Sequence, residues 1–228
     1  MELCDNLHDG GTTPSYGAIM QARDNISIGL YPIIRPRGGD FLYEDHEFEV
    51  MMRDIACCKK AGCDGVVIGM LTAAGGVDVP RTRLLVEQAW PMGVTFHRAF
   101  DRCRDPLAAL EDVISTGAER ILTSGQGPTA RDGAAVIARL VEKAAGRIAI
   151  MAGSGVRASG IAELVRATGC TEYHSRAQGR ATSKMSYRNA LVEALGAPET
   201  TWEQTDPREV AEILLRAEKA WQEAFGEG

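Results

Sequence analysis

Short runs of β-branched and apolar residues alternate with longer helical patterns along the sequence, and this rhythm limits the possible folds more than any other feature. Strand starts recur about every 30 residues, the length of one βαβ unit. Because the runs are apolar at consecutive positions, they fit a buried parallel sheet. The predicted strands are residues 1–4, 26–35, 65–69, 94–99, 120–124, 147–152 and 170–175.

Strands separated by helices favour an α/β fold of the TIM-type (β/α) barrel class. No Gly-rich dinucleotide-binding fingerprint follows the first strand, which argues against a doubly wound sheet. A doubly wound sheet stays the structural alternative. At 228 residues the chain is long enough for a single barrel domain, which we expect to span residues 1–228.

The rhythm breaks from about residue 179 onwards, where the sequence becomes polar and then Pro- and Thr-rich. We predict a C-terminal extension over residues 179–228 that ends in an amphipathic helix. The apolar residues of this helix are Val210, Ile213, Leu214, Ala217 and Trp221. Apolar helix faces usually meet the protein's own core, so we expect the helix to close the barrel flank rather than to bind a partner.

The charge and cysteine content exclude several classes of protein. With 31 acidic and 25 basic residues the formal net charge is −6, which repels a phosphate backbone, so no nucleic acid is expected as a partner. No apolar run approaches the roughly 18 residues of a membrane-spanning helix, and no leader pattern opens the chain. We expect a cytoplasmic protein with no membrane partner, whose six cysteines stay thiols.

Polar residues gather at the ends of the predicted strands, which in a parallel barrel converge on one mouth. Glu2, His97, Arg98 and Asp101 are candidates for acid/base chemistry. Glu2 lies inside a strand, where a buried carboxylate needs a cationic partner, so it is either a structural ion pair or a functional group. His97 is either a hydrogen-bonded core residue or a functional one, since an imidazole titrates near neutrality.

Two loops are candidate anion sites. Gly153, Ser154 and Gly155 form a turn between a strand and a helix, and its backbone N–H groups could cradle a phosphate or a carboxylate. The alternative is a tight turn that needs glycine only for its backbone angles. Arg35 and Arg37 lie in a Pro- and Gly-rich loop and suit bidentate anion binding, the alternative being a salt-bridged loop.

A soft-metal site is the next hypothesis, because copper and zinc prefer thiolates and imidazoles. Cys4, Cys103, His97 and His174 fall at the predicted mouth and are candidate ligands. No CxxC or HExxH pattern supports such a site.

Six stretches of the sequence are long and chemically unusual: ELCDN (2–6), GGTTPS (10–15), PIIRPRGGD (32–40), VTFHRAFD (94–101), ILTSG (121–125) and IMAGSGVR (150–157). In them the chain closely resembles the CutC copper homeostasis protein family. The resemblance implies a TIM-type barrel, a cytoplasmic location, frequent dimers and a role in copper handling through cysteine and histidine. Family members usually have another strand and helix before the strand at residues 1–4, so it also implies a barrel that lacks these two elements in this chain.

Three functions are compatible with these features. The resemblance implies copper homeostasis with direct copper ion binding. The residues themselves favour an enzyme acting on a small anionic, possibly phosphorylated, metabolite: Arg35 and the turn at residues 153–155 hold the anion while Glu2 and His97 exchange protons. A catalytically silent binding barrel is the third, because fold does not fix function. The expected partner is a copper ion or a small anionic molecule, with a homodimer as a further expectation.

Overall fold

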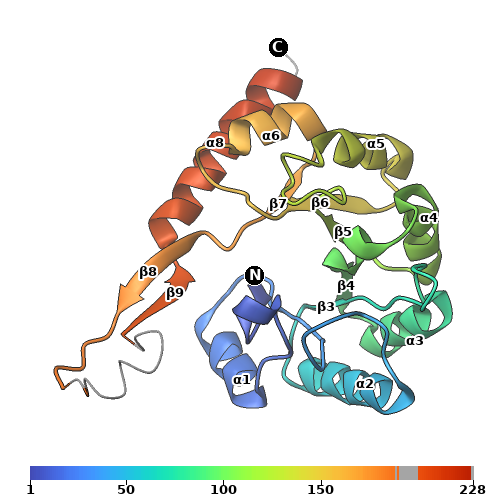
Figure 1. Cartoon of the computed structure of the whole chain (residues 1–228), viewed down its shortest axis with the longest axis horizontal. Helices are drawn as coiled ribbons and strands as arrows, with labels where there is room; N and C mark the ends of the chain where they lie inside the picture. Colours follow the sequence, from blue (N-terminus) through green and yellow to red (C-terminus); the bar gives the residue numbers. More distant parts are fainter. Residues whose placement is uncertain (188, 190–199, 227–228) are drawn as a thin grey trace.

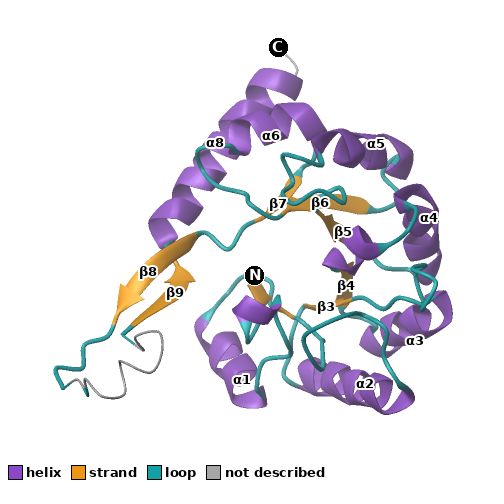
Figure 2. Ribbon diagram, in the orientation of Figure 1, coloured by secondary structure: helices purple, strands orange, loops and turns teal. Residues whose placement is uncertain are grey.

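The computed structural model describes residues 1–187, 189 and 200–226. Parallel strands form the inner wall of an incomplete ring, and helices cover its outer side (Figure 1, Figure 2). The parallel strands are β1 (Glu2–Leu3), β2 (Tyr31–Pro32), β3 (Gly65–Ile68), β4 (Gly93–Phe96), β5 (Arg120–Thr123), β6 (Ala149–Gly153) and β7 (Glu172–His174). Each overlaps a predicted strand, and the α/β barrel class is confirmed.

The strands pair in chain order. β1 pairs with β2, β3 to β7 form one five-stranded parallel sheet, and a single parallel bridge from Ile33 to Val67 joins β2 to β3. Within the described residues β1 and β7 have no backbone pairing with each other, so the ring is open between them. A TIM-type barrel has eight strands, and the described part of this chain supplies seven.

The outer layer consists of helices that follow the strands in turn. They are α1 (Tyr16–Asn25), α2 (Asp45–Lys60), α3 (Val79–Ala89), α4 (Pro106–Thr116), α5 (Ala134–Ala144) and α6 (Ile161–Thr168), with short 3₁₀ helices η1 (Leu7–Asp9) and η2 (Arg98–Arg102) in two loops. Apolar residues on the inner faces of these helices, such as Ile55, Leu85, Leu110 and Ile137, are fully buried against the sheet. The burial of each such side chain stabilises the folded state by roughly 1.5–3 kcal/mol.

The chain continues past the barrel into a hairpin and a long helix. β8 (Gln178–Thr182) and β9 (Thr201–Thr205) pair antiparallel and project away from the ring, and α8 (Pro207–Phe225) packs along α6 (Figure 1). Ile213 is buried in this packing, whereas Leu214 and Leu215 are exposed. Residue 188 and residues 190–199 of the predicted extension, with residues 227–228, lie outside the described residues. No helix of the described chain is long and apolar enough to cross a membrane.

A network of charges fills the interior at the amino ends of the strands. Arg120 on β5 donates through Nε and Nη2 to Glu172 on β7 and through Nη1 to Glu119 at 2.9 Å and Thr95 Oγ1 at 3.3 Å. The Tyr31 hydroxyl on β2 donates to Glu119 Oε1 at 3.2 Å. One guanidinium therefore links side chains of β4, β5 and β7, and Glu119 extends the network to Tyr31 on β2.

We predict that Arg120→Ala lowers the free energy of unfolding by about 2–3 kcal/mol, because it leaves two partly buried carboxylates without their cation. Urea denaturation followed by circular dichroism measures the change. Arg139→Ala, at an exposed position of α5, is the matched control and should stay within about 0.5 kcal/mol of the parent chain. Equal losses in the two variants would contradict a stabilising role for the network.

Candidate functional site at the barrel mouth

A cavity of about 1000 Å³ opens at the carboxyl ends of the parallel strands. The charged residues that line it are Arg35, Arg98, Arg102, Arg157, Arg176, Glu2, Asp9 and Asp40. Five arginines against three carboxylates leave an excess of two positive charges when the histidines are neutral, although the whole chain has a net charge of −6. This local excess of positive charge favours an anionic ligand.

Glu2 on β1 and His174 on β7 meet across the open side of the ring. Glu2 Oε2 lies 3.0 Å from His174 Nε2, and Cys4 donates its S–H to Glu2 Oε1 at 3.2 Å. Burial alone would raise the pKa of Glu2, but the hydrogen bond and charge of His174, together with the hydrogen bond from Cys4, outweigh it and lower the pKa. Glu2 is therefore a carboxylate that holds His174 by one nitrogen, and the other, Nδ1, has no hydrogen-bond partner among the described residues.

The same carboxylate controls the Cys4 thiol. Burial, then the negative charge of Glu2 and the hydrogen bond to it, raise the pKa of Cys4 far above its ordinary value. The thiol stays protonated near neutral pH and acts as a hydrogen-bond donor to Glu2.

His97, which directly follows β4, is a neutral donor rather than a titrating group. The residue is only 4% exposed, and Nδ1 accepts a hydrogen bond from the Ala99 backbone N–H at 3.1 Å, which puts the ring proton on Nε2. Burial lowers the pKa of His97 to about 4, opposed by Glu2 and assisted by Arg35. The expectation that this imidazole titrates near neutrality is therefore wrong. Its Nε2–H is buried and has no acceptor among the residues that the structure describes.

Gly69, just past the end of β3, makes room for the His97 ring. A Cβ atom at position 69 would lie 2.4 Å from His97 Cε1, closer than any side chain tolerates. On another side the Phe41 ring packs against the imidazole, with 5.0 Å between the ring centroids. The absence of a side chain at position 69 leaves room for the His97 ring, and the contact with Phe41 restricts its orientation.

Arg35 is a buried cation with no carboxylate partner among the described residues. Its Nη1 donates to the carbonyls of Asp9 and Gly11 at 2.7 and 2.8 Å, and its Nη2 donates to the carbonyl of Gly39 at 2.8 Å. The guanidinium lies over the Phe41 ring, and its buried Nε makes no hydrogen bond with the part of the chain that the structure describes. Because carbonyls do not neutralise its charge, Arg35 keeps the capacity to pair with an anion.

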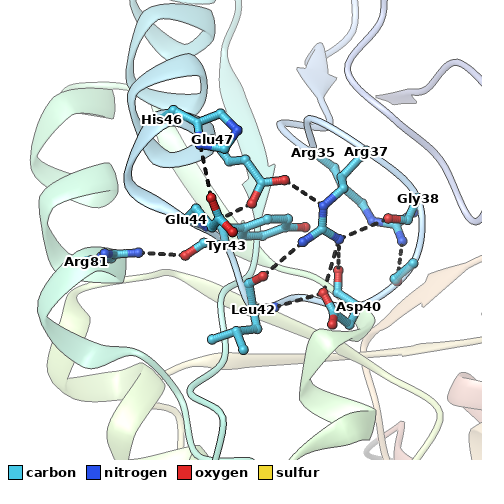
Figure 3. A network of polar contacts seen from close by, with 11 residues as sticks. Arg35, Arg37, Gly38, Asp40, Leu42, Tyr43, Glu44, His46, Glu47 and Arg81 are labelled. Carbon is cyan, nitrogen blue, oxygen red and sulfur yellow. Dashed lines mark hydrogen bonds and ion pairs between the residues drawn. The ribbon is translucent and has the colours of Figure 1, made fainter.

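Arg37 lies two residues further on but outside the cavity lining. Its Nε donates to Glu47 Oε1 at 2.5 Å and its Nη1 donates to Asp40 Oδ1 at 3.0 Å, while its guanidinium stacks over Tyr43 (Figure 3). Two carboxylates already satisfy Arg37, so the structure does not bring it together with Arg35 around one ligand. This is the salt-bridged loop that was the alternative for this segment.

The turn at Gly153, Ser154 and Gly155 borders the cavity beside His174. Ser154 and Gly155 have φ angles of 84° and 69°, and the hydrogen bond from Ser154 Oγ to the carbonyl of Pro128, 3.0 Å long, holds the turn in place. The backbone N–H groups of Gly155 and Val156 donate to no acceptor in the described part of the chain. Successive free N–H groups in such a conformation are suited to binding an anion.

Arg98 and Asp101 have different places at the mouth. Arg98 lines the cavity and is half-exposed, and its Nε donates to Asp101 Oδ2 at 2.8 Å. Asp101 is buried outside the lining and accepts hydrogen bonds from the Ser124 N–H at 2.9 Å and from the Thr123 hydroxyl. Asp101 therefore fixes the loop and orients Arg98 without reaching the cavity.

The four candidate metal ligands do not meet at one point. Cys103 is buried away from the cavity, its Sγ lies 3.9 Å from the Ala99 carbonyl, and burial raises its pKa to about 12. Cys4, His97 and His174 all line the cavity. Among the described residues, however, no three His, Cys, Asp or Glu side chains are arranged to hold a metal ion. The described residues therefore offer no metal site with three such ligands.

Three cavity arginines, Arg102, Arg157 and Arg176, were not singled out from the sequence. Arg176 donates to the Leu7 carbonyl at 2.7 Å, and Arg157 donates to the Gln178 carbonyl at 3.1 Å. Arg176 stands two residues after His174, and the alternation of side chains along a strand is the signal that could have identified it.

The chain matches the model of the CutC family over residues 1–179. It is 52% identical over 222 residues to the family protein CutC of Chromobacterium violaceum, covering 96% of this chain and 90% of the relative. The corresponding protein of Xylella fastidiosa is 44% identical over 214 residues, covering 94% of this chain and 79% of the relative.

Solved structures agree with these sequence matches. The crystal structure of the putative copper homeostasis protein CutC from Streptococcus agalactiae superposes with a TM-score of 0.73 at 36% identity, covering 76% of this chain and 86% of that one. An aldolase called QR15 superposes with a TM-score of 0.56 at 16% identity, over 69% of this chain and 73% of that one, which shows a shared fold alone.

The fold and the cavity define a TIM-type barrel with a polar, positively charged pocket at its mouth. Within that class the sequence matches decide the family. The chain belongs to the CutC family.

We predict that iodoacetamide modifies Cys4 at least about tenfold more slowly than the exposed Cys57, because the thiolate is the reactive form and Glu2 disfavours it. Glu2→Gln removes the negative charge and should accelerate the modification of Cys4. Peptide mass spectrometry measures both rates in one sample, with Cys57 as the internal reference. An unchanged Cys4 rate in Glu2→Gln would show that the carboxylate does not control the thiol.

Proposed function

We propose that the barrel mouth binds a small anionic metabolite and that the Glu2–His174 pair exchanges a proton with it. The observation that supports this most directly is the charge of the lining, where five arginines stand against three carboxylates in a chain of net charge −6. An anionic ligand would balance this local excess of positive charge.

His174 is the better proton carrier of the two cavity histidines. Its side chain is 29% exposed and lines the cavity, Glu2 accepts from its Nε2–H, and its Nδ1 has no hydrogen-bond partner within the described part of the chain. A carboxylate in this position fixes the tautomer of the imidazole and stabilises the imidazolium that forms when Nδ1 takes a proton. Glu2 then acts through His174, and His97 stays neutral beside them.

We predict that inorganic phosphate binds the protein and that Arg35→Lys weakens binding at least about fivefold, because the flexible ammonium does not reproduce the planar guanidinium. Arg37→Lys, two residues away and outside the cavity, should bind as the parent chain does. Isothermal titration calorimetry at two salt concentrations measures both variants, with thermal unfolding to confirm that each is folded. Equal weakening in the two variants would place the anion elsewhere.

Direct copper binding, which the name of the family suggests, is a second candidate. The observation in its favour is that Cys4, Glu2 and His174 form one chain of contacts of 3.2 and 3.0 Å at the mouth. Against it stand the protonated Cys4 thiol and the lack of a three-ligand group among the described residues.

A titration of the reduced protein with Cu(I) against a competing chelator tests the copper hypothesis. We expect no site that competes with the chelator, because the candidate ligands do not converge. A tight site that is lost in Cys4→Ser and kept in Cys103→Ser would instead establish copper binding at the mouth.

A further inference from the structure

Two leucines line the mouth cavity with much of their surface exposed. Leu7 lies on η1, after β1, and is 40% exposed, and Leu42 lies between β2 and α2 and is 46% exposed. A single exposed leucine is common on a protein surface and needs no explanation. These two, however, border one cavity, so they give its wall an apolar side that a ligand can reach.

Hydrogen bonds join the loops that bear the two leucines. Arg35 Nη1 donates to the Asp9 carbonyl at 2.7 Å, and Arg35 Nη2 donates to the Gly39 carbonyl at 2.8 Å. The loop after β1 is thereby tied to the loop after β2. Arg37 Nη2 donates to the Leu42 carbonyl at 2.9 Å (Figure 3). The apolar side is therefore a fixed part of the wall, held from behind by two arginines.

Two arginines after β6 and β7 give the cavity a positively charged side. Arg157 donates to the Gln178 carbonyl at 3.1 Å, and Arg176 donates to the Leu7 carbonyl at 2.7 Å. Neither arginine pairs with a carboxylate in the part of the chain that the structure describes. The turn of residues 153–155 borders the same side, and α6, which follows it, lies across the ring from α2 (Figure 1).

Carboxylates stand on the apolar side of the cavity. Asp9 comes two residues after Leu7, Asp40 comes two residues before Leu42, and both carboxylates line the cavity. They disfavour an anion on this side, because like charges repel. A ligand with an anionic end at the turn of residues 153–155 and an uncharged, apolar end at the leucines matches this distribution.

The volume and the charge of the cavity narrow the class of ligand. The cavity holds about 1000 Å³, which is at the upper end of the roughly 300–1000 Å³ of small-molecule sites and far more than an inorganic anion fills. The excess of two positive charges in the lining matches a phosphate monoester, whose charge is roughly −1.5 to −2 at neutral pH. A carboxylate supplies only one negative charge.

We propose that the ligand of the mouth is a phosphate monoester with an apolar organic group. The phosphate lies at the turn of residues 153–155 beside Arg157 and Arg176, and the apolar group lies against Leu7 and Leu42. This assignment rests on the proposed anion site and goes beyond it, because it names the anionic group and the chemical character of the rest of the ligand.

The experiment compares two phosphate monoesters of the same shape. Glycerol 3-phosphate has two hydroxyl groups, and 2-methylbutyl phosphate has the same skeleton with both hydroxyl groups replaced by methyl groups. We expect the full chain to bind 2-methylbutyl phosphate at least about tenfold more tightly, because its methyl groups leave water at the leucines. Isothermal titration calorimetry measures both affinities. The carboxylate with the same hydrocarbon group, 3-methylpentanoate, should bind at least about tenfold more weakly than 2-methylbutyl phosphate.

Leu84 provides a matched control for Leu42. It is 47% exposed, lies on α3 and does not line the cavity. We expect Leu42→Ser to weaken the binding of 2-methylbutyl phosphate at least about fivefold and to change that of glycerol 3-phosphate less than twofold. Leu84→Ser should change neither affinity. Thermal unfolding confirms that both variants are folded.

Arg157 tests the other end of the ligand. We expect Arg157→Gln to weaken the binding of both phosphate monoesters by the same factor, at least about threefold, because it removes a charge beside the phosphate and leaves the leucines in place. Unchanged affinities in this variant would overturn the position of the phosphate. Equal binding of 3-methylpentanoate and 2-methylbutyl phosphate would overturn the choice of phosphate.

The remaining outcomes separate this inference from the proposed function. If inorganic phosphate binds but 2-methylbutyl phosphate binds no more tightly than glycerol 3-phosphate, the apolar group is wrong and the anion site stands. Equal effects of Leu42→Ser and Leu84→Ser would likewise overturn the apolar side. If neither inorganic phosphate nor any of these organic anions binds, both proposals fall.

Discussion

The contact between Glu2 and His174 is the interaction on which the mouth of the barrel depends. It joins β1 to β7 where the described strands have no backbone pairing, and it keeps a carboxylate ionised inside the ring. That charge adds to burial in keeping the Cys4 thiol protonated and opposes the loss of basicity that burial imposes on His97. One carboxylate therefore influences the protonation of two neighbouring side chains, because charges interact strongly where little water screens them.

The parallel strands could be predicted from the sequence because each is a short apolar run followed by helical periodicity, and all seven are present. The β8–β9 hairpin was not predicted. Its strands have no buried face, with residues such as Arg180, Glu203 and Gln204 exposed or half-exposed, so the alternation of apolar and polar residues that marks a strand is absent. Its pairing depends on backbone hydrogen bonds and on polar side-chain contacts, such as the hydrogen bond from Arg180 Nη2 to Thr201 Oγ1, 3.1 Å long. These interactions leave no trace in hydropathy.

The candidate site was predictable in position but not in role. The rule that side chains after parallel strands converge correctly gathered Glu2, Cys4, His97 and His174 at one cavity. It could not separate Arg35 from Arg37, which share one loop, because their difference lies in the distant carboxylate of Glu47. Nor could it show that His97 is too deeply buried to titrate near neutrality. The protonation state of a side chain and its ion-pair partner depend on residues that are distant in the sequence, so a local segment cannot predict them.

The close approach of Gly69 to the His97 ring has a consequence for sequence variation. Since a Cβ at position 69 would overlap the imidazole, the two positions are not independent: a chain that gains even alanine at one must give up the large ring at the other or displace the strand. Substitutions at Gly69 should therefore be tolerated only in combination with a smaller residue at position 97. Positions 69 and 97 should therefore vary together, because the absence of a side chain at Gly69 leaves room for the ring of His97, 28 positions further along the chain.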